Sequence, residues 1–193
     1  AHRGIPLAAA RVAIEGFGNV GIFAARFLTE AGLRIVAVSD SKGAIYNQNG
    51  LPWKELLKVK RMKGSVVNFL NSEKLDNEKI FTLPVDVLIP AALPDVINAT
   101  NADEVNASVI VEGANIAVTP EAETMLEKRG VLIIPDITGN AGGVISSYAE
   151  YKGYDAEKMF KLVKEKITKS VNAVLAESKK TGESPRAVAM AIA

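Results

Sequence analysis

Three glycines with a fixed spacing follow an apolar run near the start of the chain. The segment reads Val12-Ala13-Ile14-Glu15-Gly16-Phe17-Gly18-Asn19-Val20-Gly21. Gly16 can make a tight turn in which a Cβ would be penalised, and Gly18 lets the backbone approach a diphosphate closely. Gly21 allows the next helix to pack on the strand, with its free N–H groups facing the diphosphate. We therefore expect residues 16–21 to bind a diphosphate.

A carboxylate completes the unit that these glycines begin. Apolar residues at three- and four-residue spacing predict a helix from Val20 to Leu28, Gly32 ends it, and residues 35–38 predict a buried strand. Asp40 stands 19 residues after Gly21, where a carboxylate can accept hydrogen bonds from an adenosine ribose. This order predicts a dinucleotide-binding βαβ unit. The alternative is a glycine turn that serves only packing.

Five continuous apolar runs alternate with helical patterns and define the fold class. These runs are residues 12–14, 35–38, 86–90, 108–112 and 131–134. Such runs are typical of parallel strands that are covered on both faces. We predict an α/β fold with a doubly wound parallel, Rossmann-like sheet. It forms one dinucleotide-binding domain over residues 1–193, with residues 155–193 as its C-terminal helical part.

The connecting segments give weaker predictions. We expect a polar loop and then a short helix opened by Pro52 in residues 41–63, with Lys58, Lys60, Arg61 and Lys63 on a solvated face. Residues 65–83 predict a crossing segment with one short helix around Asn77, and residues 98–104 a short polar helix. Thr119 is expected to cap a helix that begins at Pro120. One long amphipathic helix closes the chain, and its apolar stripe is assigned to core packing: Met159, Leu162, Val163, Ile167, Val171, Val174 and Leu175.

Composition excludes several kinds of protein. The 193 residues carry 23 basic and 22 acidic side chains, a net charge of +1, so no nucleic-acid partner is expected. No apolar run reaches the length of a membrane span, and no membrane partner is expected. The absence of cysteine fits a cytoplasmic protein. His2 is the single histidine, so we predict no histidine-based catalytic triad or metal site, and we assign no catalytic or metal-binding residue.

Small and polar residues follow the other predicted strands. They are Ala91-Ala92, Gly113-Ala114-Asn115 and Asn140-Ala141-Gly142-Gly143. Ligands of open parallel sheets lie across the carboxyl ends of the strands. Small side chains leave room there for a flat ring, and the amides of Asn115 and Asn140 can match a carboxamide. The alternative is that these residues only form turns.

These motifs together resemble the coenzyme-binding domain of glutamate dehydrogenases. The resemblance rests on Gly16 to Gly21, Val38 to Gly43, Pro90-Ala91-Ala92, Glu112 to Asn115 with Thr119 to Ala122, and Pro135-Asp136-Ile137 with Asn140 to Val144 and Ser147-Tyr148. It implies oxidative deamination of L-glutamate to 2-oxoglutarate and ammonia, with NAD or NADP as cofactor.

The resemblance also assigns roles to single positions. The pyrophosphate would be held by the loop Gly16, Phe17, Gly18, Asn19, Val20 and Gly21, and the adenosine ribose would face Asp40 and Ser41. The coenzyme cleft would be lined by Ala91 and Ala92, and the nicotinamide would be approached by Asn115 and Asn140. The substrate would be reached by Val144 and Ser147. Asp40 favours NAD, whereas Ser41 and Lys42 could accommodate the phosphate of NADP.

The catalytic lysines and aspartate of the resembling family belong to an upstream substrate domain that this sequence does not include. We therefore expect this chain to bind cofactor with little or no turnover of glutamate, and its parent enzyme to be a homo-hexamer. Three alternatives stay open at this point. One is the coenzyme domain of a branched-chain or aromatic amino-acid dehydrogenase. The others are a non-catalytic dinucleotide-binding module and a domain that keeps the fold but binds nothing.

Overall fold

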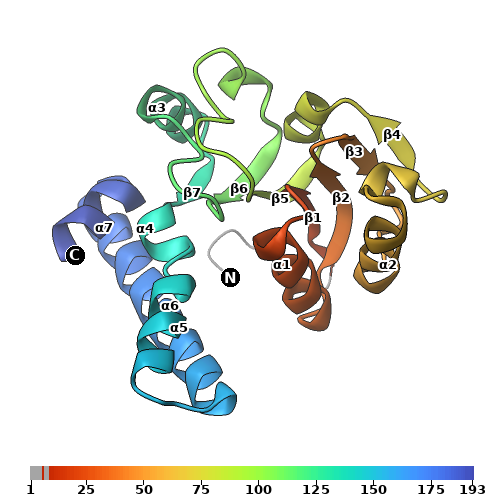
Figure 1. Cartoon of the computed structure of the whole chain (residues 1–193). Coiled ribbons are helices and arrows are strands. Elements are labelled where there is room, and N and C mark those ends of the chain that lie inside the picture. Colours follow the sequence, from red (N-terminus) through yellow and green to blue (C-terminus); the bar gives the residue numbers. More distant parts are fainter. Residues whose placement is uncertain (1–5, 7–8) are drawn as a thin grey trace.

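The computed structural model describes Pro6 and residues 9–193, and a seven-stranded sheet lies at its centre (Figure 1). His2 and most of the expected N-terminal lead-in lie outside the described residues. The strands are β1 (Arg11–Glu15), β2 (Arg34–Asp40), β3 (Gly43–Tyr46), β4 (Glu73–Leu75), β5 (Val85–Pro90), β6 (Ala107–Val111) and β7 (Leu132–Ile134). The helices are α1 (Asn19–Glu30), α2 (Trp53–Lys63), α3 (Pro120–Lys128), α4 (Asp136–Gly139), α5 (Gly142–Tyr151), α6 (Ala156–Thr181) and α7 (Pro185–Ile192), with 3₁₀ turns η2 (Val66–Asn68), η3 (Asn77–Thr82) and η4 (Ala102–Glu104).

The strand order is β4-β3-β2-β1-β5-β6-β7. The strands β2, β1, β5, β6 and β7 are parallel, with Val12 opposite Val87 and Leu88 opposite Ile110. These are the five strands that the apolar runs predict. Because the order runs outward from β1 in both directions, the carboxyl ends of β1 and β5 meet at the point where the chain reverses its direction of winding. The predicted doubly wound sheet is confirmed.

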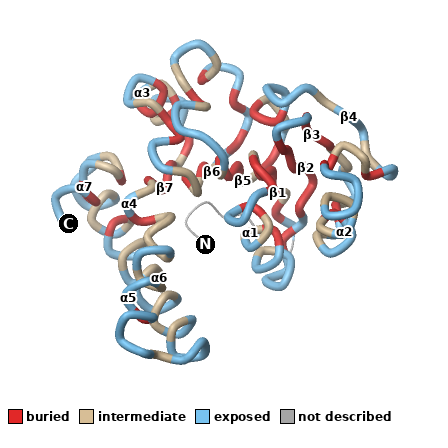
Figure 2. The backbone as a smooth tube through the Cα atoms, viewed as in Figure 1, coloured by how far each residue is buried: buried red, intermediate tan, exposed pale blue. Residues whose placement is uncertain are grey.

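Both faces of the sheet are covered. Val12 and Ile14 join one buried cluster together with α1 and α2 residues, whereas Ala13 joins a second cluster with α3 residues. Neighbouring residues of one strand point to opposite faces, so a strand buried on both faces must be apolar at every position. Figure 2 shows the resulting band of buried backbone through the sheet.

The sheet is mixed at one edge, and two of its strands were not predicted. Residues 43–46, expected in a polar loop, form β3, which pairs antiparallel to β2. Residues 73–75, expected in a crossing segment, form β4 against β3. Ala44 and Ile45 are fully buried, but the run from Ala44 to Tyr46 lies between turn residues and does not stand out from the polar loop around it. The expected short helices around Asn77 and near residues 98–104 are present as η3 and η4.

The C-terminal helices differ from the expectation of one long closing helix. α6 ends at Thr181, where Gly182 adopts a left-handed φ of 78°, and α7 follows as a separate helix. Of the predicted apolar stripe on α6, Val174 is fully buried and the other members are partly exposed. Figure 1 shows α5 and α6 side by side, extending away from the sheet. Val174, Val188 and Ala189 form a small cluster between α6 and α7.

Within Pro6 and residues 9–193, the structure contains no helix whose length and apolar content would allow it to span a membrane.

Candidate functional site

The loop of residues 16–21, here called the glycine loop, connects β1 to α1. Gly16 has a φ of +93°, and a Cβ there would lie 2.7 Å from Ala92 Cβ. A Cβ on Gly21 would lie 1.8 Å from the carbonyl oxygen of Gly16, so only glycine lets α1 start this close to β1. A Cβ on Gly18 would meet nothing within 4 Å. The loop is therefore closed on the protein side and open above Gly18.

The first turn of α1 has unoccupied backbone donors. Gly18 is the N-cap residue, no side chain caps the helix, and no acidic residue stands in its first turn. Free N–H groups and the positive end of the helix dipole form an anion site. Ser39 Oγ accepts a hydrogen bond from Gly16 N at 3.0 Å and so fixes the loop to the end of β2. The arrangement fits a diphosphate placed above Gly18.

A cleft of about 780 Å³ lies at the carboxyl ends of β1, β2 and β5. It contains six of the predicted site residues, namely Gly16, Phe17, Gly18, Asp40, Ser41 and Ala92. Phe17 is fully buried in the cluster with Val12 and Ile14, so its side chain anchors the loop. Of the remaining loop residues, Asn19 and Val20 are exposed and Gly21 is buried. Ala91 borders the loop, since its N–H donates to the carbonyl of Glu15 at 2.8 Å.

Asp40 lies at the end of β2 as predicted, but its carboxylate already has protein partners. Oδ1 accepts from Ser65 Oγ at 2.9 Å and from Lys42 N at 3.0 Å, and Oδ2 accepts from Val66 N at 2.9 Å. Burial raises the pKa of Asp40, but these hydrogen bonds and the charge of Lys60 outweigh it and hold the pKa below 3.8. Asp40 is therefore ionised, and it ties β2 to the segment after α2.

Lys60 contradicts the prediction of a solvated basic face. Its Nζ lies 3.3 Å from Asp40 Oδ2, and its side chain is 27% exposed. Lys58, Arg61 and Lys63 on the same helix are exposed, as predicted. Lys60 also lines the cleft, so it is a cation at the site where a ribose is expected. The charge run in the sequence could not distinguish this lysine from its neighbours.

Glu15 is a second residue of the cleft that the sequence pattern did not single out. Its Oε2 accepts from the N–H groups of Ala91 and Ala92, each at 3.2 Å. Burial raises the pKa of Glu15 above 4.5, and these two hydrogen bonds reduce the rise. Glu15 thereby joins the end of β1 to the loop after β5.

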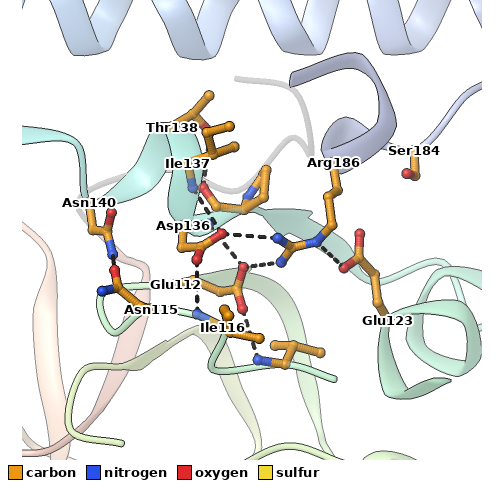
Figure 3. A network of polar contacts seen from close by, with 12 residues as sticks. Glu112, Asn115, Ile116, Glu123, Asp136, Ile137, Thr138, Asn140, Ser184 and Arg186 are labelled. Carbon is orange, nitrogen blue, oxygen red and sulfur yellow. Dashed lines mark hydrogen bonds and ion pairs between the residues drawn. The ribbon is translucent and has the colours of Figure 1, made fainter. Parts of the chain in front are cut away.

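Asn115 and Asn140 meet at the other end of the sheet edge. Asn140 Nδ2 donates to Asn115 Oδ1 at 2.7 Å (Figure 3). Asn140 follows the short helix α4 rather than the end of a strand, which corrects the predicted loop position. Val144 and Ser147 lie on α5, Val144 being 77% exposed and Ser147 Oγ donating to the carbonyl of Gly143. The amides of Asn115 and Asn140 each carry a donor and an acceptor, which is the chemistry that recognises a carboxamide.

Next to Asn115 lies a group of charged side chains that sequence patterns did not predict. We call Glu112, Glu123, Asp136 and Arg186 the carboxylate network (Figure 3). The guanidinium of Arg186 contacts all three carboxylates, with Nη1 to Asp136 Oδ1 at 2.9 Å. Glu112 is fully buried, and it accepts from Val118 N at 2.8 Å and Asp136 N at 2.9 Å.

The pKa values of Glu112 and Asp136, two carboxylates of the network, shift in opposite directions. Burial raises the pKa of Glu112 above 4.5, although Val118 N, Arg186 and Asp136 N counteract the rise. Burial also raises the pKa of Asp136, but hydrogen bonds from Ile116 N and Arg186 bring it below 3.8. Burial lowers the pKa of Arg186, and the surrounding carboxylates raise it by more. In Pro6 and residues 9–193, no group of three or more His, Cys, Asp or Glu side chains is arranged to hold a metal ion.

The doubly wound sheet and the helices on both of its faces define a Rossmann-like α/β fold. The family of glutamate, leucine, phenylalanine and valine dehydrogenases matches residues 1–193, and the chain belongs to this oxidoreductase family. The recognised resemblance to glutamate dehydrogenases is thereby confirmed.

Three relatives illustrate the match. Glutamate dehydrogenase of Aeropyrum pernix is 52% identical over 140 residues, which are 72% of this chain and 34% of the relative. NADP-specific glutamate dehydrogenase of Saccharolobus shibatae is 42% identical over 191 residues, 95% of this chain and 45% of the relative. The crystal structure of hetero-hexameric glutamate dehydrogenase from Thermus thermophilus superposes with a TM-score of 0.88 at 32% identity. The superposition covers 98% of this chain and 46% of the T. thermophilus chain. The chain thus spans less than half the length of these relatives.

Proposed function

We propose that this chain is the coenzyme-binding part of an NAD(P)-dependent glutamate dehydrogenase, which deaminates L-glutamate to 2-oxoglutarate and ammonia. The observation that carries this is the glycine loop, open only above Gly18 and placed at the uncapped start of α1. The family and the names of its glutamate dehydrogenase relatives support glutamate as the substrate. The coenzyme, when bound, supplies the hydride acceptor.

The residues of this chain bind and orient the coenzyme in this proposal. Backbone N–H groups of the glycine loop hold the diphosphate, and the cleft of about 780 Å³ holds the adenosine part. The nicotinamide ring of the coenzyme then extends past Ala91 and Ala92 toward Asn115 and Asn140, whose amides orient its carboxamide. Val144 and Ser147 face the substrate. The groups that act on the amino acid belong to the remainder of the parent enzyme, so this chain alone binds coenzyme without turnover.

Both coenzymes are expected to bind. Asp40 opposes a phosphate on the ribose, whereas Lys60 and the hydroxyl of Ser41 favour one, and all three residues line the same cleft. The S. shibatae relative is named NADP-specific, which supports acceptance of the phosphate. We further propose that the parent enzyme is a hexamer, as the T. thermophilus protein is.

Calorimetric titration of the 193-residue chain with NAD and, separately, NADP tests the proposal. Saturable binding is expected for both, and Gly18→Ala is expected to weaken it at least about tenfold, because its methyl occupies the space left for the diphosphate. Ser108→Ala is the control, because it changes an exposed side chain of β6 that does not line the cleft. A folded chain that binds neither coenzyme contradicts the proposal, and glutamate-dependent coenzyme reduction by the pure chain contradicts its inactivity.

A further inference from the structure

The segment that carries Asn115 is held by two carboxylates, the buried Glu112 and the partly buried Asp136. Residues 113–118 connect β6 to the turn before α3. Asp136 Oδ2 accepts from Ile116 N at 2.9 Å, and Glu112 Oε1 accepts from Val118 N at 2.8 Å. Ile116 adopts a φ of +49°, a conformation that β-branched residues rarely adopt. The backbone next to Asn115 is therefore kept in an unfavourable conformation by these contacts.

Both carboxylates depend on one guanidinium. Arg186 Nη2 contacts Glu112 Oε2, and Nη1 contacts Asp136 Oδ1 at 2.9 Å. The planar group of arginine can satisfy several oxygens at fixed angles, which a lysine ammonium cannot do. The side chains of Glu112 and Asp136 are only 0% and 14% exposed, so water cannot replace the cation for Glu112. Arg186 thus determines where both carboxylates lie.

The position of Arg186 influences the proposed carboxamide site through two successive contacts. Arg186 fixes Asp136, and Asp136 fixes Ile116 N, directly beside Asn115. Asn115 Oδ1 then accepts from Asn140 Nδ2, which commits one polar atom of each amide and leaves Asn115 Nδ2 and Asn140 Oδ1 to face a ligand. One donor and one acceptor are what a carboxamide needs.

We propose that Arg186 is a positioning residue for the carboxamide end of the coenzyme site, an inference that rests on the proposed function. Arg186 touches no coenzyme in this proposal. It places the Asn115–Asn140 pair through Asp136 and Glu112, and because it lies on α7, it joins the C-terminal helices to the coenzyme edge of the sheet (Figure 3).

The test compares two ligands that differ in the nicotinamide. NAD and ADP-ribose are titrated into the wild-type chain, Arg186→Lys and Asp136→Asn. We expect the affinity for NAD to fall about tenfold in both variants, the loss of roughly one hydrogen bond, while the affinity for ADP-ribose changes less than about twofold. A role in folding alone would change both affinities together or neither, so the ratio of the two affinities is the decisive readout.

Glu123→Gln is the matched control. Glu123 contacts Arg186 as closely as Glu112 does, but it bonds no backbone group of residues 113–118. Its ratio of NAD to ADP-ribose affinity is expected to equal that of the wild type. If Arg186→Lys does not fold, Asp136→Asn carries the test.

Three outcomes overturn the inference. They are an unchanged ratio in Asp136→Asn, the same change of ratio in Glu123→Gln, and equal wild-type affinity for the two ligands. A wild-type chain that binds neither ligand instead overturns the proposed function, so the two failures are distinguishable.

Discussion

The glycine loop and the carboxylate network stand at the same edge of one sheet, yet they are built differently. The loop owes its shape to missing side chains, since a Cβ on Gly16 or Gly21 would collide with neighbouring atoms. The network owes its shape to four charged side chains, and its central pair is separated by 74 residues. A site made by backbone geometry is encoded by neighbouring residues, whereas a site made by ion pairs depends on distant ones.

The largest effect is expected from Gly21→Ala. Alanine favours a helix over glycine by about 1 kcal/mol, but its Cβ would lie 1.8 Å from Gly16 O, so α1 must move off β1. We expect the free energy of unfolding to fall by about 4 kcal/mol or more in urea denaturation. Gly18→Ala, whose methyl enters open space, should unfold like the wild type. Equal stability of both variants would mean that steric fit does not shape the loop.

Arg186→Met is expected to have the next largest effect. It leaves two buried carboxylates and the partly buried Asp136 without their cation, which costs about 3 kcal/mol in the free energy of unfolding. Arg129→Met is the control, because the guanidinium of Arg129 donates to the carbonyls of Ala102 and Val105 and not to a carboxylate. We expect about 1 kcal/mol there. Equal losses in urea denaturation would show that the network acts through ordinary hydrogen bonds and not through charge.

Asp40→Asn should have a smaller effect that depends on pH. The pKa of Asp40 is lower in the folded chain than the ordinary value of 3.8, so ionised Asp40 stabilises the fold at pH values above 3.8. Below that value the unfolded chain binds the proton first, and the contribution is lost. The variant should therefore be about 2 kcal/mol less stable at neutral pH, with a difference that shrinks as the pH falls below 3.8.

Urea denaturation of both proteins across the acid range provides that measurement. Asp103→Asn, at an exposed position of η4, should leave the free energy of unfolding unchanged throughout. A difference between wild type and Asp40→Asn that stays constant to low pH would contradict the assigned role of the carboxylate.

The same contrast explains what the sequence could predict. The five parallel strands and the glycine loop follow from apolar runs and spacing within about thirty residues. Thr119 was also predicted as a helix cap, and its Oγ1 accepts from Ala122 N at 3.4 Å. Asp40 was located correctly, but its partners Ser65 and Val66 come 25 and 26 residues later and carry no pattern.

The unpredicted features depend on contacts that only the folded chain creates. β3 is too short to stand out, and Lys60 looks like its solvated neighbours until the fold brings it to Asp40. Arg186 is an isolated arginine in the sequence, and nothing near it indicates Glu112 or Asp136. The roles of Asn115, Asn140, Val144 and Ser147 stay predictions that ligand binding must test.

The sequence separation of Glu112 and Arg186 also determines how long Glu112 lacks its cation while the chain is being synthesised. The glycine loop can close once Ala92 has been made, because its partners Ser39 and Ala92 are then present. Glu112 must wait for the 74 residues that separate it from Arg186. At typical translation rates this takes roughly 4 to 15 s. A nascent chain stalled before Arg186 would therefore hold a closed glycine loop, while the carboxylates of Glu112, Glu123 and Asp136 would still have no cation.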